Sequence, residues 1–193
     1  MNEKPVDRRT LKTKKLIRDA LAVLMTDREL QKVTVKDITD LADINRGTFY
    51  KHYLDVYDLY EKTEQEILIE IGMLVLKLEE LPPDKIFSTL IDYIDENRAI
   101  FRMIFSPNAS QALRAKFGRC VDGLFRQIES EKTGIDLNDS RLRYQTCYRS
   151  QGFIAVIAQW VTEGFAEPKD IVVRIVSELD ANTERIIKPL QKK

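Results

Sequence analysis

The fold is decided by the stretch Thr34-Val-Lys-Asp-Ile-Thr-Asp-Leu-Ala-Asp-Ile-Asn-Arg-Gly-Thr-Phe-Tyr-Lys-His-Tyr53. Thr34 and Asn45 each stand directly before an apolar pattern, where their side chains are good N-caps because they accept from the free N–H groups of a first helical turn. Residues 42–44 lie between the two patterns and leave room only for a tight turn. The stretch therefore predicts two short helices joined by a turn.

The apolar residues of this stretch give each predicted helix one buried face. Ile38, Leu41 and Ala42 recur at three and four positions in the first helix, and Phe49 and Tyr53 lie four apart in the second. Ile44 in the turn is expected to lie buried between the two helices. This pattern is typical of a helix-turn-helix, whose second helix enters the major groove of DNA.

Basic and polar side chains occupy the remaining face of the second predicted helix. Arg46 and Lys51 suit phosphates or guanine, Thr48 suits a base edge, and hydroxyl or imidazole groups donate to phosphate oxygens. A plain helical hairpin with a solvated face is the alternative interpretation. The residues predicted to bind DNA are Thr34, Lys36, Asn45, Arg46, Gly47, Thr48, Tyr50, Lys51 and His52.

The run Asn45-Arg-Gly-Thr-Phe-Tyr-Lys-His-Tyr53, followed by Asp55 and Leu59, resembles the recognition helix of the TetR family of bacterial transcriptional regulators. The resemblance covers about the first sixty residues, from Thr13 onward. Two positions depart from the family pattern. Asp43 stands where the family usually has glycine in the turn, and Val56 stands where it often has a phosphate-contacting lysine. The resemblance implies a DNA-binding repressor that a small molecule releases from its operator.

Helical patterns continue along the whole chain, without the two-residue alternation of a sheet. A first helix over 10–25 buries a stripe that includes Leu16, Ile17 and Leu21, and closes a three-helix head. A long helix over 56–81 ends at Pro82-Pro83. Further helices are expected over 84–97, 99–105, 110–132, 140–165 and 169–188. We therefore predict an all-α protein with a DNA-binding domain at 1–55 and a helical regulatory and dimerisation domain at 56–193.

The charge distribution supports this division. The whole chain is neutral, but residues 1–53 hold twelve Lys and Arg against eight Asp and Glu, a net charge of +4, which leaves −4 for the remainder. Residues 1–9 are expected to be a loose arm. Its basic residues, together with Lys12, Lys14 and Lys15, either lie along phosphates or belong to a solvated, frayed terminus.

Several function classes are not supported by the sequence. The longest apolar runs fall short of the roughly 20 residues of a membrane span, and the polar N-terminus lacks a signal-peptide core. Cys120 and Cys147 are expected to be reduced thiols in the cytoplasm, with a redox switch as the alternative. His52 is the only histidine, so we expect no enzyme, no metal site and no cofactor.

A symmetric homodimer is predicted from the last two long helices. The segment 152–161 is apolar nearly all round, so one subunit is not expected to bury it completely, and the family resemblance also implies a four-helix interface. The alternative is that both helices are internal core. The predicted interface residues are Phe153, Ile157, Trp160, Val161, Ile171, Val172, Ile175 and Leu179.

The resemblance also implies a small-molecule pocket within the helical body. Tyr144, Cys147, Tyr148 and Gln151 share one helix face, and a buried tyrosine hydroxyl needs a partner. The alternative is that the tyrosines point their hydroxyls to solvent. Lysine and arginine are absent from the candidates, which favours an uncharged or aromatic effector over a phosphorylated one. The candidate pocket residues are Tyr93, Phe101, Met103, Phe117, Cys120, Leu124, Tyr144, Cys147, Tyr148 and Gln151.

Overall fold

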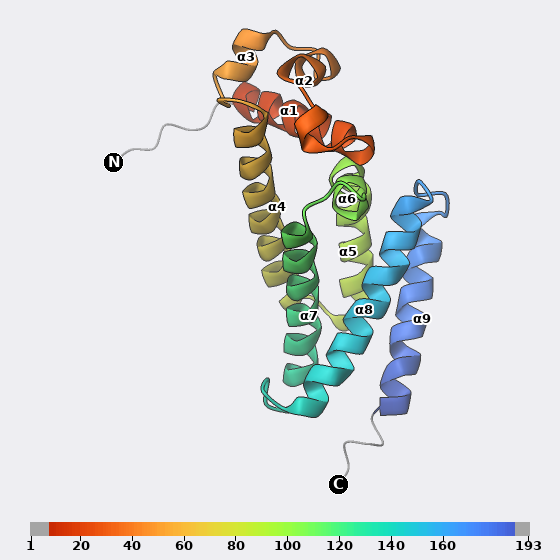
Figure 1. Cartoon of the computed structure of the whole chain (residues 1–193). Helices are drawn as coiled ribbons and strands as arrows, with labels where there is room; N and C mark the ends of the chain where they lie inside the picture. The colour runs from red at the N-terminus through yellow and green to blue at the C-terminus, as the bar shows by residue number, and fades with distance from the viewer. Residues whose placement is uncertain (1–7, 188–193) are drawn as a thin grey trace. The chain divides into compact units, whose positions relative to one another are not determined.

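All regular secondary structure in residues 8–187, which a computed structural model describes, is helical (Figure 1). The all-α fold class is thereby confirmed. In this part of the chain no helix is both long and apolar enough to cross a membrane. The helices are α1 (Arg8–Asp27), α2 (Val35–Leu41), α3 (Arg46–Tyr50), α4 (Val56–Glu79), α5 (Pro83–Glu96), α6 (Arg98–Phe105), α7 (Gln111–Thr133), α8 (Ser140–Thr162) and α9 (Lys169–Ile187), with a 3₁₀ turn η1 (Leu30–Lys32) before α2.

The helix ends follow local chemistry, and most lie within two residues of the predicted ends. Helix α8 is the exception, because it stops at Thr162 rather than continuing to Phe165. Gly164 and Phe165 have φ angles of 76° and 63°, a left-handed conformation that ends a helix. Their N–H groups donate to the carbonyl oxygens of Val161 and Trp160 at 3.0 and 2.9 Å. These bonds satisfy carbonyls that the last turn of α8 leaves without partners.

Residues 8–67 and 99–110 form one compact unit. It contains α1, η1, α2, α3, the first half of α4, and α6. Ile17 and Leu21 of α1 are fully buried, as are Ile38 of α2, Phe49 of α3 and Leu59 of α4. Val33, which precedes the cap of α2, is also buried. The core of this unit therefore joins α1 to the helix pair that the sequence predicts.

Two apolar residues that were expected in this core are exposed. Leu16 of α1 and Leu41 of α2 keep 41% and 51% of their surface accessible, so their predicted burial is wrong. The buried face of α1 includes Arg18, whereas Leu16 lies outside it. Ile44 in the turn is half-buried. The periodicity of apolar residues predicts which face of each helix is buried. Which residues at the border of that face are buried depends on the helix that packs against it.

Residues 68–98 and 111–187 form the second compact unit. It contains the second half of α4 with α5, α7, α8 and α9. Phe87 of α5, Phe125 of α7 and Phe153 of α8 bring their ring centroids within 5.8–6.1 Å of one another, a distance typical of packed aromatic pairs. The predicted division at residue 55 stays a prediction.

The proposed set of dimer contacts is largely internal to one chain. Phe153, Ile157, Trp160, Val161 and Val172 are all buried in the single subunit. This burial arises within one subunit, where α8 packs its apolar face on α7 and α9. The assignment of these residues to a dimer interface stays a prediction. Of the other predicted interface residues, Ile171 is half-buried, whereas Ile175 and Leu179 are exposed.

The predicted N-terminal arm lies mostly outside the described residues, which begin at Arg8. Arg8 and Arg9 themselves are helical, as the first residues of α1. Their inclusion in a loose arm was therefore wrong. The α1 helix extends far enough to bring its basic N-terminal turns into the first compact unit.

Candidate nucleic-acid interface

Helix α2 begins with a reciprocal cap between Thr34 and Asp37. The Asp37 N–H donates to Thr34 Oγ1 at 3.2 Å, and the Thr34 N–H donates to Asp37 Oδ2 at 2.9 Å. Such a capping box satisfies two N–H groups that a helix start leaves without partners. The hydrogen bonds from Thr34 hold the pKa of Asp37 below its ordinary value. The predicted N-cap is confirmed, so the Thr34 hydroxyl already has a structural role.

The turn between α2 and α3 is built around a left-handed Asp43 with a φ of 53°. The Asp43 and Ile44 N–H groups donate to the carbonyl oxygens of Asp40 and Thr39 at 3.4 and 3.0 Å. This pattern is a Schellman motif, which usually has glycine at the left-handed position. Aspartate tolerates that conformation better than most residues, so the turn forms without the glycine.

Helix α3 starts at a cap made by Asn45. Its Oδ1 accepts from the Thr48 N–H at 2.8 Å and from the Thr48 hydroxyl at 3.0 Å. A Cβ placed on Gly47 would lie 3.3 Å from the same Asn45 Oδ1, which is a tight contact. The absence of a Cβ at Gly47 therefore leaves room for Asn45 Oδ1 to accept the capping hydrogen bonds. Asn45 and Thr48, both predicted to contact DNA, orient the start of α3 through these bonds.

Phe49 and Tyr53 anchor α3 from behind. Both are buried, with ring centroids 5.7 Å apart. The opposite face exposes Arg46, Gly47 and Lys51. Tyr50 is 57% exposed while the edge of its ring packs against Phe49. The arrangement presents two cations and a phenol hydroxyl on a helix that its aromatic residues hold in place.

The flanking predicted residues differ in exposure. Lys36 on α2 is exposed, whereas His52 after α3 is half-buried. Burial lowers the pKa of His52, and the positive charges of Lys14 and Lys51 lower it further. Lys14 of α1 thus adds positive charge beside α3. Two lysines, one from α1 and one at the end of α3, therefore place positive charge near His52.

One contributor at the start of α4 was missed by the sequence interpretation. Lys62 Nζ donates to Asp58 Oδ2 at 2.9 Å and to the His52 carbonyl oxygen at 3.5 Å, and it lies 5.4 Å from the Tyr53 ring centroid. Asp58 Oδ2 also accepts from the Leu54 N–H at 2.9 Å. The start of α4 therefore holds the end of α3. The spacing of Asp58 and Lys62, four apart on a helix, is the sequence signal for this contact.

The ten candidate pocket residues are divided between the two compact units, and their common pocket stays a prediction. Phe101 and Met103 belong to the first compact unit and the other eight to the second. Phe117 and Leu124 are buried, and Cys120 is half-buried.

Tyr144, Cys147, Tyr148 and Gln151 share one face of α8 as predicted, but that face is exposed in the single chain. Tyr93 is half-buried and donates its hydroxyl to Glu70 Oε2 at 3.1 Å. A polar residue on α4 therefore satisfies this tyrosine, as a buried hydroxyl requires.

Comparisons with known proteins agree on the class. Residues 83–180 match the family model described as "Transcriptional regulator C-terminal region". The Bacillus subtilis (strain 168) protein named "Uncharacterized HTH-type transcriptional regulator YxbF" is 23% identical over 171 residues. That alignment covers 84% of this chain and 43% of the relative, so this chain matches less than half of the relative's length.

Two solved structures illustrate the shared fold. The "Dihydroxyacetone kinase operon activator DhaS" is 19% identical with a TM-score of 0.60, over 90% of this chain and 97% of that one. FadR from Bacillus subtilis, solved in complex with stearoyl-CoA, is 17% identical with a TM-score of 0.59, over 86% of this chain and 95% of that one. The matched family and relatives are transcriptional regulators rather than enzymes.

Proposed function

Because this chain belongs to the TetR family of transcriptional regulators, we propose that it binds a palindromic operator as a homodimer and represses transcription until a small molecule releases it. Such a protein works where bacterial DNA lies, in the cytoplasm. The proposal joins three parts, which are a DNA-reading helix, a symmetric interface and an effector site. Each part has its own support.

The observation that carries the proposal is the exposed face of α3. Arg46, Tyr50 and Lys51 project from a helix that buried Phe49 and Tyr53 hold fixed. Cations that reach phosphates give affinity, and those that reach base edges give sequence preference. The neighbouring charge of Lys14 adds to the positive potential on this side of the unit.

Dimerisation is supported by the outer faces of the last two long helices. Tyr144 and Tyr148 of α8 are exposed, as are Ile175 and Leu179 of α9. Two long helices that both expose large apolar side chains suit a four-helix interface across a two-fold axis. Two heads are needed to reach both half-sites of a palindrome.

An effector is supported by an apolar cleft in the second compact unit, with Phe87, Phe125 and Ile128 among its lining residues. The FadR neighbour from Bacillus subtilis holds stearoyl-CoA, a ligand with a long apolar chain. Release would follow if the ligand binds better to the arrangement of heads that misfits DNA, a difference typically of ~1–3 kcal/mol.

A second candidate function is a co-regulator that acts through a protein partner. Ile69, Met73 and Leu76 form an exposed apolar stripe along α4, and exposed stripes of this kind often mark protein contacts. The neighbour DhaS is named as an operon activator. DNA binding by the purified protein alone discriminates the two functions, since an adaptor needs its partner.

The test is a footprint on the intergenic DNA beside the chain's own gene, made with the purified protein. We expect protection of one palindrome. The double variant Tyr50→Phe/His52→Ala removes a hydroxyl and an imidazole without changing the buried anchors, and should weaken protection at every site. Unchanged affinity in that variant would exclude these contacts. Absence of any protected palindrome would favour the adaptor.

A further inference from the structure

A cleft of about 380 Å³ opens in the second compact unit between the end of α4, the start of α5, and α7, α8 and α9. Leu78, Ile86, Phe87, Phe125 and Ile128 are among its apolar lining residues. A smaller hollow of about 130 Å³ shares Phe87 and Phe125 with it and continues along α8 and α9. The larger volume falls within the range of small-molecule sites.

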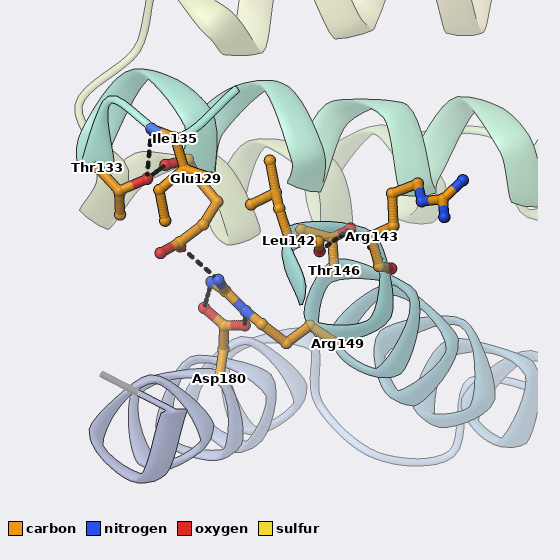
Figure 2. A network of polar contacts seen from close by, with 8 residues as sticks. All are labelled: Glu129, Thr133, Ile135, Leu142, Arg143, Thr146, Arg149 and Asp180. Carbon is orange, nitrogen blue, oxygen red and sulfur yellow. Dashed lines mark hydrogen bonds and ion pairs between the residues drawn. The ribbon is translucent and has the colours of Figure 1, made fainter. Parts of the chain in front are cut away.

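Both hollows share one polar group, the ion pair of Arg149 and Asp180. Arg149 Nε and Nη2 donate to the two carboxylate oxygens of Asp180, each at 2.8 Å, and Nη1 donates to Glu129 Oε2 at 2.6 Å (Figure 2). The Arg149 side chain is only 7% exposed. Burial alone would lower its pKa, but hydrogen bonds and charges from Asp180 and Glu129 raise it above the ordinary value.

The charges around this cluster do not balance. One guanidinium meets two carboxylates, so the cluster of Glu129, Arg149 and Asp180 carries a formal charge of −1. At the rim, Glu131 and Lys132 offset each other. Both lining cations among the described residues are engaged, since Arg149 pairs with two carboxylates and Lys132 has a partner of its own. The four charged lining residues, Glu131, Lys132, Arg149 and Asp180, sum to zero. The excess negative charge therefore comes from Glu129, which is buried against Arg149 but does not itself line the cleft.

We propose that this cleft binds a lipophilic organic cation, with its apolar body between the aromatic walls and its charge beside the cluster. In a site of low dielectric constant, the negative charge in excess on the cluster attracts a cation much more strongly than it would in water. The faces of nearby phenylalanine rings add to this attraction. Arg149 already makes a cation–π contact of this kind, because its Cζ lies 5.6 Å from the Phe125 ring centroid.

The inference names the ligand class of the proposed effector site, and it rests on the proposed function for any effect on DNA. Binding itself is independent of DNA and is measured without it. An acyl carboxylate or other amphipathic anion is the competing ligand class. For that ligand the buried cation of the cleft, Arg149, is already paired with two carboxylates.

The test uses two ions of the same shape and opposite charge, tetraphenylphosphonium and tetraphenylborate, in calorimetric titrations of the full chain. We expect tetraphenylphosphonium to bind at least about tenfold more tightly than tetraphenylborate. Asp180→Asn keeps the shape of the cluster but removes its excess charge. This variant should weaken tetraphenylphosphonium about tenfold and strengthen tetraphenylborate. Asp170→Asn, an exposed change on the same helix, should leave both affinities unchanged.

A second variant locates the site independently of the ion cluster. Ile128→Trp fills the larger hollow, so it should abolish binding of tetraphenylphosphonium while the thermal unfolding of the variant stays cooperative. Equal or tighter binding of tetraphenylborate by the parent protein, or unchanged binding in Ile128→Trp, overturns the inference. Either result leaves operator protection untouched, so a failure of the ligand class is distinguishable from a failure of the DNA-binding proposal.

Discussion

Asn108 donates from Nδ2 to the carbonyl oxygen of Met25 at 3.2 Å, although 83 positions separate the two residues. The same amide group donates to the Thr26 carbonyl oxygen at 3.3 Å, and the Ser106 hydroxyl approaches Met25 O at 3.3 Å. The last turn of a helix leaves carbonyl groups without partners. The α6–α7 loop thus caps the end of α1 within the first compact unit.

We expect Asn108→Ala to destabilise this unit by about 1–3 kcal/mol, because the Thr26 carbonyl oxygen loses its side-chain donor and the Met25 carbonyl oxygen keeps only the Ser106 hydroxyl. Denaturant unfolding measures the loss of stability, and amide hydrogen exchange in the last turn of α1 shows whether the loss is located there. Asn138→Ala is the matched control, since Asn138 lies on an exposed loop. Equal protection of the α1 amides in the parent and in Asn108→Ala would contradict the capping role.

Lys51 provides a prediction about DNA itself. Lys51→Ala should weaken binding to all sequences and reduce the slope of log affinity against log salt by about one unit, because one phosphate contact is lost. Lys116→Ala removes an equally exposed lysine from α7 and should not change the slope. Fluorescence anisotropy across a salt series measures both variants. Identical slopes for Lys51→Ala and the parent would place Lys51 away from the phosphates.

The helix-turn-helix could be predicted in detail from sequence because its determinants are local. Thr34, Asp43 and Asn45 act through hydrogen bonds to residues within four positions. In contrast, the exposure of Leu16 and the burial of Arg18 depend on which neighbour covers α1. The helical periodicity of the sequence does not show which neighbour packs against α1.

The second unit shows the same limit more strongly. The apolar run 152–161 was compatible both with a dimer interface and with internal core, and periodicity could not show that packing within the same chain would bury Phe153, Ile157 and Trp160. The ion cluster joins Arg149 to Asp180 across 31 positions. Its members were ordinary charged residues of separate helices when only the sequence was considered.

Arg149 should be essential to the stability of the second unit as long as Glu129 remains ionised beside it. Arg149→Met leaves the buried Glu129 carboxylate without its cation, at a cost of about 3–5 kcal/mol. Adding Glu129→Gln and Asp180→Asn should recover much of this loss. Arg143→Met, on an exposed position of the same helix (Figure 2), is the control in urea unfolding. A triple variant no more stable than Arg149→Met would contradict this charge-based explanation.

Asp37 should make the stability of the first compact unit depend on pH in the acid range. Its pKa is lowered in the folded state, chiefly by hydrogen bonds from Thr34, so the unfolded state takes up a proton first as the pH falls. Its contribution is therefore complete above the ordinary value of 3.8 and is lost as the pH falls through the lowered folded pKa. Thermal unfolding should show Asp37→Asn less stable than the parent at pH 7, with the difference shrinking at pH 3. For Asp40→Asn, on an exposed position of the same helix, we expect no such convergence.

Leu179 tests the dimer that the proposed function requires. It is 54% exposed on α9, and Leu76 on α4 is 59% exposed, so the same substitution at the two sites alters surfaces of similar exposure. An arginine from each subunit near a two-fold axis would bring like charges together in an apolar contact. Leu179→Arg should therefore give a monomer at micromolar concentration, whereas Leu76→Arg should keep the parent's oligomeric state. Light-scattering mass measures both, and anisotropy on a palindrome should show weaker binding for Leu179→Arg alone. A dimeric Leu179→Arg together with a monomeric Leu76→Arg would move the interface to α4.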